Sequence, residues 1–485
     1  MRSRPFTRVC LFAAFAVLAA SCGRSGPAPR QPTTTTEPPA RAVTELAPTP
    51  TSIGDPLAPG LGNGGYDVVA YDLAVQWKPK LATARITATV EAEATEALDT
   101  FTLDFAEFAI QSITVNGEDA KADLDRSKLT VTPASPIAAG DTFVTEVRYV
   151  GPPGLHRSDL ARHEVGWTIT DTGTVFVTAD PDGTHLWAPV NDHPLDRATW
   201  RIEISAPTPL FGIASGDMTN RVQGPETTTT EWTTSQPVGP QAITLAIRDA
   251  TLMEPKTSSG VDLRNLLPAA MADDPPPVLG KVDAMIDFLE QRLGPFPYDS
   301  YGIAVVDGIS PPLPANTWSI LTAEQLADEN QAELRIVADL ARHWFGDSAT
   351  PRTWSEVWLS TSLPLYASWM WLENQNGSKS IEVVARVARS EVKDSAWQAP
   401  NDPIEGDIYG TATFLYGAVY LHALRLKIGD RAFFDLLRTL HSDHKGDVIT
   451  TSDLVSETYR ASGQDLRFYI DAWFAADPLP GFPDA

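Results

Sequence analysis

Three neighbouring side chains, Asp339, Arg342 and His343, bring a carboxylate, a guanidinium and an imidazole into one short stretch of the chain. Asp339 and Arg342 are at positions i and i+3, which are neighbours on a helix surface, so we expect them to form an ion pair. Such a pair is worth about 0.3 to 0.5 kcal/mol if it is open to water. His343 is turned about 100° away from Arg342 around the helix axis. We interpret it as a polar group partly covered by packing.

Two predicted helices must position these residues. From Glu333 to Phe345 the apolar residues recur at helical spacing, which predicts an amphipathic helix that ends at Gly346. A second helical run extends from Trp354 to about Glu373, and Trp, Leu and Tyr dominate its buried side. Two packed helices of this kind can hold a site between them.

Residues 66–250 follow a different period. Runs such as YDVVAYDLAVQW, ARITATVEAEA and TWRIEISAP alternate apolar and polar residues and are separated by turn residues, which predicts an antiparallel β domain. The last third of the chain returns to helical spacing, as in FLYGAVYLHALRLKIGD.

The two helices resemble the aminopeptidase N family of zinc aminopeptidases, which are thermolysin-like gluzincins. The family reads roughly V-x-H-E-L-A-H-Q-W-F-G and W-L-N-E-G-F-A-x-Y, where this chain reads VADLARHWFG at 337–346 and WLSTSLPLY at 358–366. With YLHALRLKIGD and SGQDL further on, the resemblance covers roughly residues 62–482. It implies an α+β protein with an antiparallel β-saddle domain at 61–252 and a mostly helical, thermolysin-like domain at 253–485.

The family's metal and catalytic positions carry other residues here. In the family, two His at i and i+4 and a later Glu bind zinc, and a Glu between the His is the general base. Ala338 and Arg342 stand at the His positions, Thr361 at the third ligand and Asp339 at the base. Ala and Thr offer neither imidazole nor carboxylate, and Arg keeps its charge. We therefore expect no zinc and no other cofactor, with the Arg342 guanidinium near the place of the metal.

Two further family positions are also altered. The loop 308–321 lies where the family carries G-A-M-E-N, whose Glu receives the substrate's amine, and Pro314 or Asn316 occupies that position, depending on the register. Phe414 stands at the family's tyrosine, whose hydroxyl steadies an oxyanion, and phenylalanine has no donor. Tyr416 or Tyr409 could reach in from a neighbouring turn, but we interpret both as packed aromatics.

The N-terminus predicts export. Residues 1–22 combine arginines, an apolar run and the sequence AASC, which resembles a bacterial lipobox. We expect Cys22 to carry a lipid that anchors the protein outside the bacterial cell membrane, because the apolar run is too short for a membrane span. Ordinary secretion with cleavage nearby is the alternative. Residues 23–60 are rich in Pro and Thr, which predicts a disordered tether.

The acidic composition limits the partners. The chain of 485 residues has a formal net charge of −25, so it repels phosphate backbones, and nucleic acid is a poor partner. A cationic peptide or surface is electrostatically easier to bind.

Three function classes remain open. The one we favour is an inactive homologue, a pseudopeptidase, whose cleft binds a peptide or an envelope protein. The second is an active metallo-aminopeptidase or other hydrolase with a non-standard site, such as Asp339 with His343. The third is a structural envelope lipoprotein with a collapsed cleft. A cleft that is open and polar favours binding, whereas one packed with Trp and Leu favours a scaffold.

Overall fold

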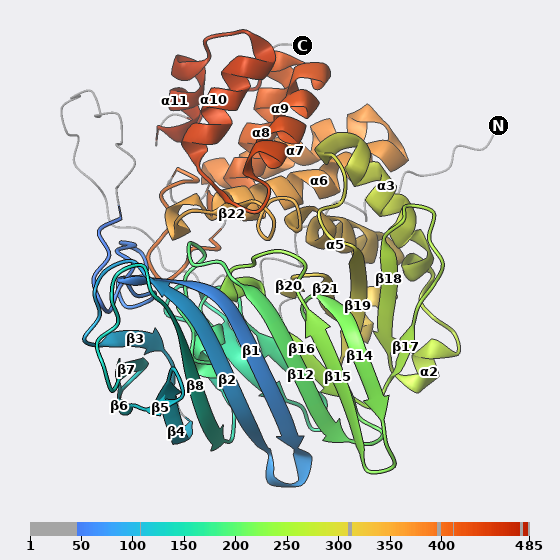
Figure 1. Ribbon diagram of the computed structural model, residues 1–485. Helices are drawn as coiled ribbons and strands as arrows, with labels where there is room; N and C mark the ends of the chain where they lie inside the picture. Colours follow the sequence, from blue (N-terminus) through green and yellow to red (C-terminus); the bar gives the residue numbers. More distant parts are fainter. Residues whose placement is uncertain are drawn as a thin grey trace.

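The computed structural model describes residues 46–483, apart from residues 107, 309–312, 395–398, 411 and 476–478. A sheet-rich domain is followed by a domain whose helices gather on one side of the molecule, as Figure 1 shows. The predicted α+β class is therefore confirmed. Cys22, the predicted signal segment and the first part of the predicted tether lie outside the described residues.

The first domain is built on an eight-stranded sheet with the order β14-β15-β12-β1-β2-β8-β4-β5. Neighbouring strands are antiparallel except β1 and β12, which pair in parallel from Ala70 opposite Thr199 to Gln76 opposite Ser205. The strands in sheet order are β14 (Asp217–Gln223), β15 (Thr227–Thr233), β12 (Thr199–Pro207), β1 (Tyr66–Lys78), β2 (Thr83–Ala94), β8 (Thr142–Gly151), β4 (Ala109–Val115) and β5 (Glu118–Asp119).

A bulge in β1 keeps its apolar residues on one face. Tyr66 and Val68 are buried at even positions, and Tyr71, Leu73 and Val75 are buried at odd positions. The pairing register with β2 shifts between Val68 and Ala70, and this extra residue reverses the alternation. The period-two pattern of the sequence therefore continues through the strand as one buried face.

Two smaller sheets complete the first domain. Five strands have the order β13 (Phe211–Ala214), β16 (Leu245–Arg248), β11 (Val175–Thr178), β10 (Glu164–Ile169) and β9 (Leu155–Arg157). Three strands have the order β3 (Phe101–Asp104), β7 (Lys128–Thr132) and β6 (Lys121–Asp125).

The second domain opens with a sheet of its own. Its order is β17 (Thr251–Met253), β18 (Asp262–Leu267), β19 (Ser300–Val306), β21 (Trp318–Thr322) and β20 (Leu313–Ala315). The three central strands are parallel, and they are buried almost throughout, as expected for parallel strands covered on both faces.

Helices cover this sheet and continue to the C-terminus (Figure 1). They include α3 (Val282–Leu293), α5 (Glu329–Arg342), α6 (Trp358–Asn376), α7 (Ser378–Asp394), α8 (Gly417–Ile428), α9 (Asp430–His444), α10 (Thr451–Ser462) and α11 (Arg467–Phe474). The first predicted site helix begins four residues earlier than Glu333 and ends three residues before Phe345. Asp328 caps it by accepting hydrogen bonds from the backbone N–H groups of Asn330 and Gln331.

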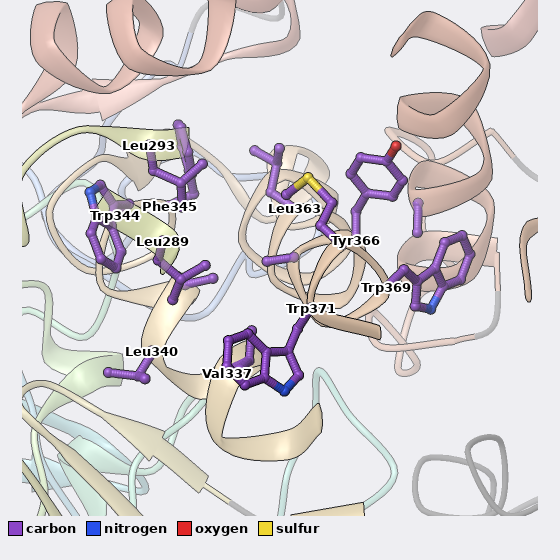
Figure 2. Packing of buried hydrophobic residues seen from close by; sticks show 14 of the residues in the cluster. Leu289, Leu293, Val337, Leu340, Trp344, Phe345, Leu363, Tyr366, Trp369 and Trp371 are labelled. Carbon is purple, nitrogen blue, oxygen red and sulfur yellow. The ribbon is translucent and has the colours of Figure 1, made fainter. Parts of the chain in front are cut away.

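α5 and α6 pack through large apolar side chains. Val337 and Leu340 of α5, and Trp344 beyond it, belong to the same buried cluster as Leu363 and Trp371 of α6 (Figure 2). Each such side chain contributes roughly 1.5 to 3 kcal/mol when fully removed from water. This cluster fixes the spacing of the two helices on which the predicted site depends.

The chain ahead of β1 is part of the fold from residue 46. The predicted tether ran to residue 60, but Ile53, Asp55 and Ala58 are buried. Asp55 accepts hydrogen bonds from the Trp354 backbone N–H in the second domain (2.8 Å) and contacts His193 Nε2 in the first (3.1 Å). A buried carboxylate that satisfies donors from both domains explains why this stretch is ordered despite its composition.

Among the described residues, no helix is both long and apolar enough to cross a lipid bilayer.

Candidate functional site

The framework of the predicted site is a pair of adjoining helices. Arg342 is the last residue of α5, and Ser360 and Thr361 are in the first turn of α6. Pro364 lies inside α6 and has no N–H, so the Ser360 carbonyl lacks its usual helical donor. The Arg342 Nη1 atom lies 3.5 Å from that carbonyl oxygen. The guanidinium therefore reaches across from one helix to the start of the next.

Arg342 pairs with a residue of the first domain. Its Nη2 donates to Asp180 Oδ2 at 2.8 Å, and its Nε lies 3.9 Å from Asp347 Oδ1. Arg342 is only 6% exposed. Burial is the largest single effect and opposes its charge, but Asp180, Tyr409 and Asp347 together outweigh burial and raise the pKa of the guanidinium. This is a buried ion pair between domains.

The predicted pair of Asp339 with Arg342 is therefore wrong. Asp339 is buried facing Ser319 and the charge of Arg335, one helical turn earlier on α5. On the helix surface, Asp339 is close enough in sequence to pair with either Arg335 or Arg342. Arg342, however, is long enough to reach a carboxylate of the other domain. Burial raises the pKa of Asp339 to about 6, against the nearby charge of Arg335.

Tyr409 completes the buried pair from the second domain. Its hydroxyl donates to Asp180 Oδ1, so both oxygens of that carboxylate have donors. Burial raises the pKa of Tyr409 well above its usual value, and the hydroxyl stays protonated. Tyr409 is thus the aromatic that reaches the site. Tyr416 instead donates to the Trp473 carbonyl, on the far side of the helical core.

Further contacts close the junction between the domains beside this cluster. The His163 ring stacks on Tyr409 with centroids 6.1 Å apart, and His163 Nε2 lies 2.8 Å from the Asp180 carbonyl oxygen. Arg162 pairs with Asp407 at 3.0 Å. The contacts with Tyr409 and Asp407 join the chain between β9 and β10 to the loop ahead of α8. The junction is lined by polar side chains but is closed. It is therefore neither the open polar cleft nor the cleft packed with Trp and Leu that we considered from the sequence.

His343 has a structural position. It is fully buried, more than the partial cover we predicted, and its Nδ1 lies 2.9 Å from the Asp339 carbonyl oxygen. Its Nε2 accepts a hydrogen bond from the Thr317 backbone N–H at 3.0 Å. Burial lowers the pKa of His343 to about 4. A neutral ring with both nitrogens engaged is not free to exchange protons near neutral pH.

Asn316, Tyr298 and Asp347 form a buried polar cluster beside Arg342. Asn316 is 0% exposed, and its side chain contacts both the Tyr298 hydroxyl and the Asp347 carboxyl. These contacts fall outside normal hydrogen-bond geometry, so the capacity of the three groups is only partly used. Burial raises the pKa of Asp347 to about 7, against the charge of Arg342. Buried groups with such unused capacity are commonly served by ordered water.

The remaining predicted positions are structurally ordinary. Thr361 donates from Oγ1 to the Val357 carbonyl at 3.1 Å, within its own helix. Ala338 is half-buried on α5. Phe414 is half-buried in a π-helical turn (Ala412–Tyr416) and packs against the helical core. For Pro314 only the backbone is described, which pairs with Ser319 in the hairpin of β20 and β21.

Sequence reasoning missed Asp180 and Asp347. Asp180 follows β11 within a run of buried residues, and an acid in such a run signals a buried partner. Asp347 directly follows the stretch VADLARHWFG at 337–346, which carries the family resemblance.

Known proteins similar to this chain fall into one class. Residues 317–473 match the Peptidase family M1 domain. Aminopeptidase N of Lactococcus lactis subsp. lactis is 24% identical over 188 residues, which are 34% of this chain and 22% of that protein. Aminopeptidase N of Streptomyces lividans is 30% identical over 151 residues, which are 28% of this chain and 18% of that protein. The chain spans about a fifth of the length of these curated relatives.

Solved structures match over nearly the whole described chain. A variant of an M1 zinc metallopeptidase from Deinococcus radiodurans has a TM-score of 0.80 at 27% identity, covering 90% of this chain and 100% of that chain. A variant bound to a Tyr-Ser-Ala substrate has a TM-score of 0.81 at 26% identity, covering 89% and 99%. The fold is that of an M1 metallopeptidase with two domains. In sequence and in fold, the chain is similar to the aminopeptidase N family.

These relatives correct our expectation about cofactors. The solved relatives are zinc metallopeptidases, so zinc is the cofactor that this fold implies. The residues at the family's ligand positions do not fit it, however, because Ala338 and Thr361 lack a suitable donor and the Arg342 guanidinium is held there by Asp180. In the part of the chain that the structure describes, no three His, Cys, Asp or Glu side chains are placed to hold a metal ion. We derive no step through the metal.

The assignment of Asp180 as the partner of Arg342 predicts a stability change. Arg342→Met should lower the free energy of unfolding by roughly 3 to 5 kcal/mol, because the Asp180 carboxylate stays buried without its cation. Asp180→Asn in the same chain should restore part of that loss. Urea denaturation of the wild type, both single variants and the double variant gives the coupling energy. A matched cycle with Asp339→Asn should give a smaller coupling, and a larger one would reject our assignment.

The raised pKa of Asp347 predicts a pH effect. A carboxyl whose pKa is raised in the folded state contributes stability that is complete below its unfolded value of about 3.9. That contribution is lost as the pH rises through the folded value of about 7. Asp347→Asn cannot ionise, so its Tm relative to wild type should rise between pH 5 and pH 8. Asp123→Asn on the exposed strand β6 should show no such trend. A relative Tm that falls with pH contradicts the prediction.

Proposed function

We propose that this protein is a member of the aminopeptidase N family that binds a peptide or an envelope protein at its domain junction without hydrolysing it. The observation that carries the proposal is the buried cluster of Arg342, Asp180 and Tyr409, where the family's catalytic centre would be. Once Tyr409 has moved away from Asp180, the guanidinium can donate hydrogen bonds to polar groups of a ligand. Neither the guanidinium nor the phenol supplies a metal-activated water or a general base.

The neighbouring polar groups support binding. The Asn316 amide contacts both the Tyr298 hydroxyl and the Asp347 carboxyl, but outside normal hydrogen-bond geometry, so these groups can exchange partners with a ligand. Peptide backbones need both donors and acceptors. Since the junction is closed in this structure, binding requires the contacts of Tyr409 with Asp180 and His163 to open.

A scaffold role is the second candidate, and the closed junction favours it. The contacts of Arg162 with Asp407, and of Tyr409 with Asp180 and His163, hold the domains together. A protein that served only as a scaffold would keep these contacts.

A hydrolase with an unusual site has less support. Asp339 has a pKa of about 6, which suits a general base, but it is buried against Ser319 and Arg335. His343 has both nitrogens engaged by backbone groups. Neither side chain has a described nucleophile to activate.

The proposal is tested with Tyr-Ser-Ala, the peptide bound by a variant of the relative. Calorimetry should detect binding, and chromatography should detect no released tyrosine, with or without added Zn²⁺. Tyr409→Phe removes one hydrogen bond of the closed junction and should tighten binding by up to about tenfold. Tyr459→Phe, which alters an exposed tyrosine on α10, is the matched control and should change nothing.

Each other outcome selects another function. Tyrosine release that a chelator abolishes would identify an active metallopeptidase. Absence of both binding and release in wild type and in Tyr409→Phe would favour the scaffold.

We further propose that Cys22 carries a lipid and that the folded domains lie outside the cell membrane. The lipobox-like sequence before Cys22 supports this. Cys22→Ser should move the protein from the detergent phase to the aqueous phase in a phase-partition assay on producing bacterial cells. Cys10→Ser is the matched control and should leave partitioning unchanged. Equal partitioning of wild type and Cys22→Ser would exclude a lipid on this residue.

A further inference from the structure

A cavity of about 740 Å³ lies away from the domain-junction site, between the edge strand β14 and the strands β18 and β19. In Figure 1 these strands lie side by side at the right of the view. Ligand pockets commonly measure about 300 to 1,000 Å³. Residues of both domains line the cavity, and none of the site residues described above is among them.

A buried guanidinium forms part of the lining. Arg264 is 4% exposed and lies over the rings of Trp232 and Trp318, 5.1 and 4.9 Å from their centroids. Its Nη2 donates to the Gly216 carbonyl at 3.0 Å, whereas its Nε has no partner among the described residues. The aromatic faces hold the guanidinium in one orientation.

Among the described residues, Arg264 has only a long ion-pair contact with a carboxylate. The Asp217 Oδ1 atom is 3.9 Å from its Nη1 and already accepts a hydrogen bond from Ser300. Burial lowers the pKa of Arg264 to about 10, against the charge of Asp217. The Arg264 guanidinium is buried, its carboxylate partner is distant and its Nε has no partner among the described residues. An anionic ligand would stabilise its charge.

The rest of the lining has the opposite charge. Glu254, Asp262 and Asp299 are exposed and line the same cavity, together with the exposed Lys256. Three carboxylates at the mouth favour ammonium groups. Leu263 and Met218 supply apolar surface between the two charged regions.

We propose that this cavity binds a basic α-amino acid, either free or as the C-terminal residue of a peptide. The carboxylate of the ligand pairs with Arg264, and its ammonium groups lie among Glu254, Asp262 and Asp299. No bond is made or broken, and the domain-junction site takes no part.

Calorimetry with three matched probes tests the proposal. L-Lysine should bind. Cadaverine, which lacks the carboxylate, and L-norleucine, which lacks the side-chain ammonium, should bind at least about tenfold more weakly, because each loses one charge-assisted contact. The tripeptide Ala-Ala-Lys separates the two sources: tighter binding than lysine identifies a peptide terminus, and weaker binding identifies a free amino acid.

Variants place the binding in the cavity. The double variant Asp262→Asn with Asp299→Asn should weaken lysine binding by roughly threefold to tenfold, as expected for two exposed charge pairs. Asp123→Asn with Asp125→Asn removes the same charge from exposed β6 and should leave lysine binding unchanged. Arg264→Gln should abolish the preference for lysine over cadaverine. If Arg264→Gln does not fold, the double variant Asp262→Asn with Asp299→Asn decides the question.

Three results would overturn the proposal. They are the absence of lysine binding up to about 10 mM, equal binding of lysine and cadaverine to the wild type, and unchanged lysine affinity in the double variant Asp262→Asn with Asp299→Asn.

Discussion

A charge that leaves water must find a partner, and the burial of Arg342 imposes that condition on both domains. Its nearest compensation comes from Asp180, which is 162 residues earlier in the chain. The loop after β11 must therefore stand against the end of α5, and Tyr409 must fill the remaining acceptor of the same carboxylate. The relative position of the two domains is therefore fixed by the Arg342 guanidinium as well as by apolar packing.

Within this fold, the apolar residues that pack the helices and the polar residues of the candidate site have separate roles. The large apolar residues of α5 and α6 pack the two helices together (Figure 2). Between these helices, the Arg342 guanidinium lies near the Ser360 carbonyl at the start of α6. Arg342 also reaches out of the helix pair to Asp180 of the first domain, so the apolar packing accommodates its charge.

Local pattern predicted much of this architecture. Helical spacing located α5 and α6 to within a few residues, and alternation located the strands of the first domain. The partner of Arg342 was not predicted, because i and i+3 spacing favoured Asp339 and the apolar surroundings of Asp180 do not indicate which cation it meets. The order of residues 46–60 was missed for a similar reason: a Pro-rich composition suggested a tether, whereas Asp55 is fixed by distant donors. The parallel pairing of β1 with β12 is also non-local.

The contacts of Asp55 have a mechanical consequence. Its carboxylate contacts His193 in one domain and the Trp354 backbone in the other, just ahead of the first long strand. A pulling force applied to the chain before residue 46 would thus reach both domains through one residue. Both domains would then resist the force together at their junction, and the strands of the first domain would not be pulled away one at a time.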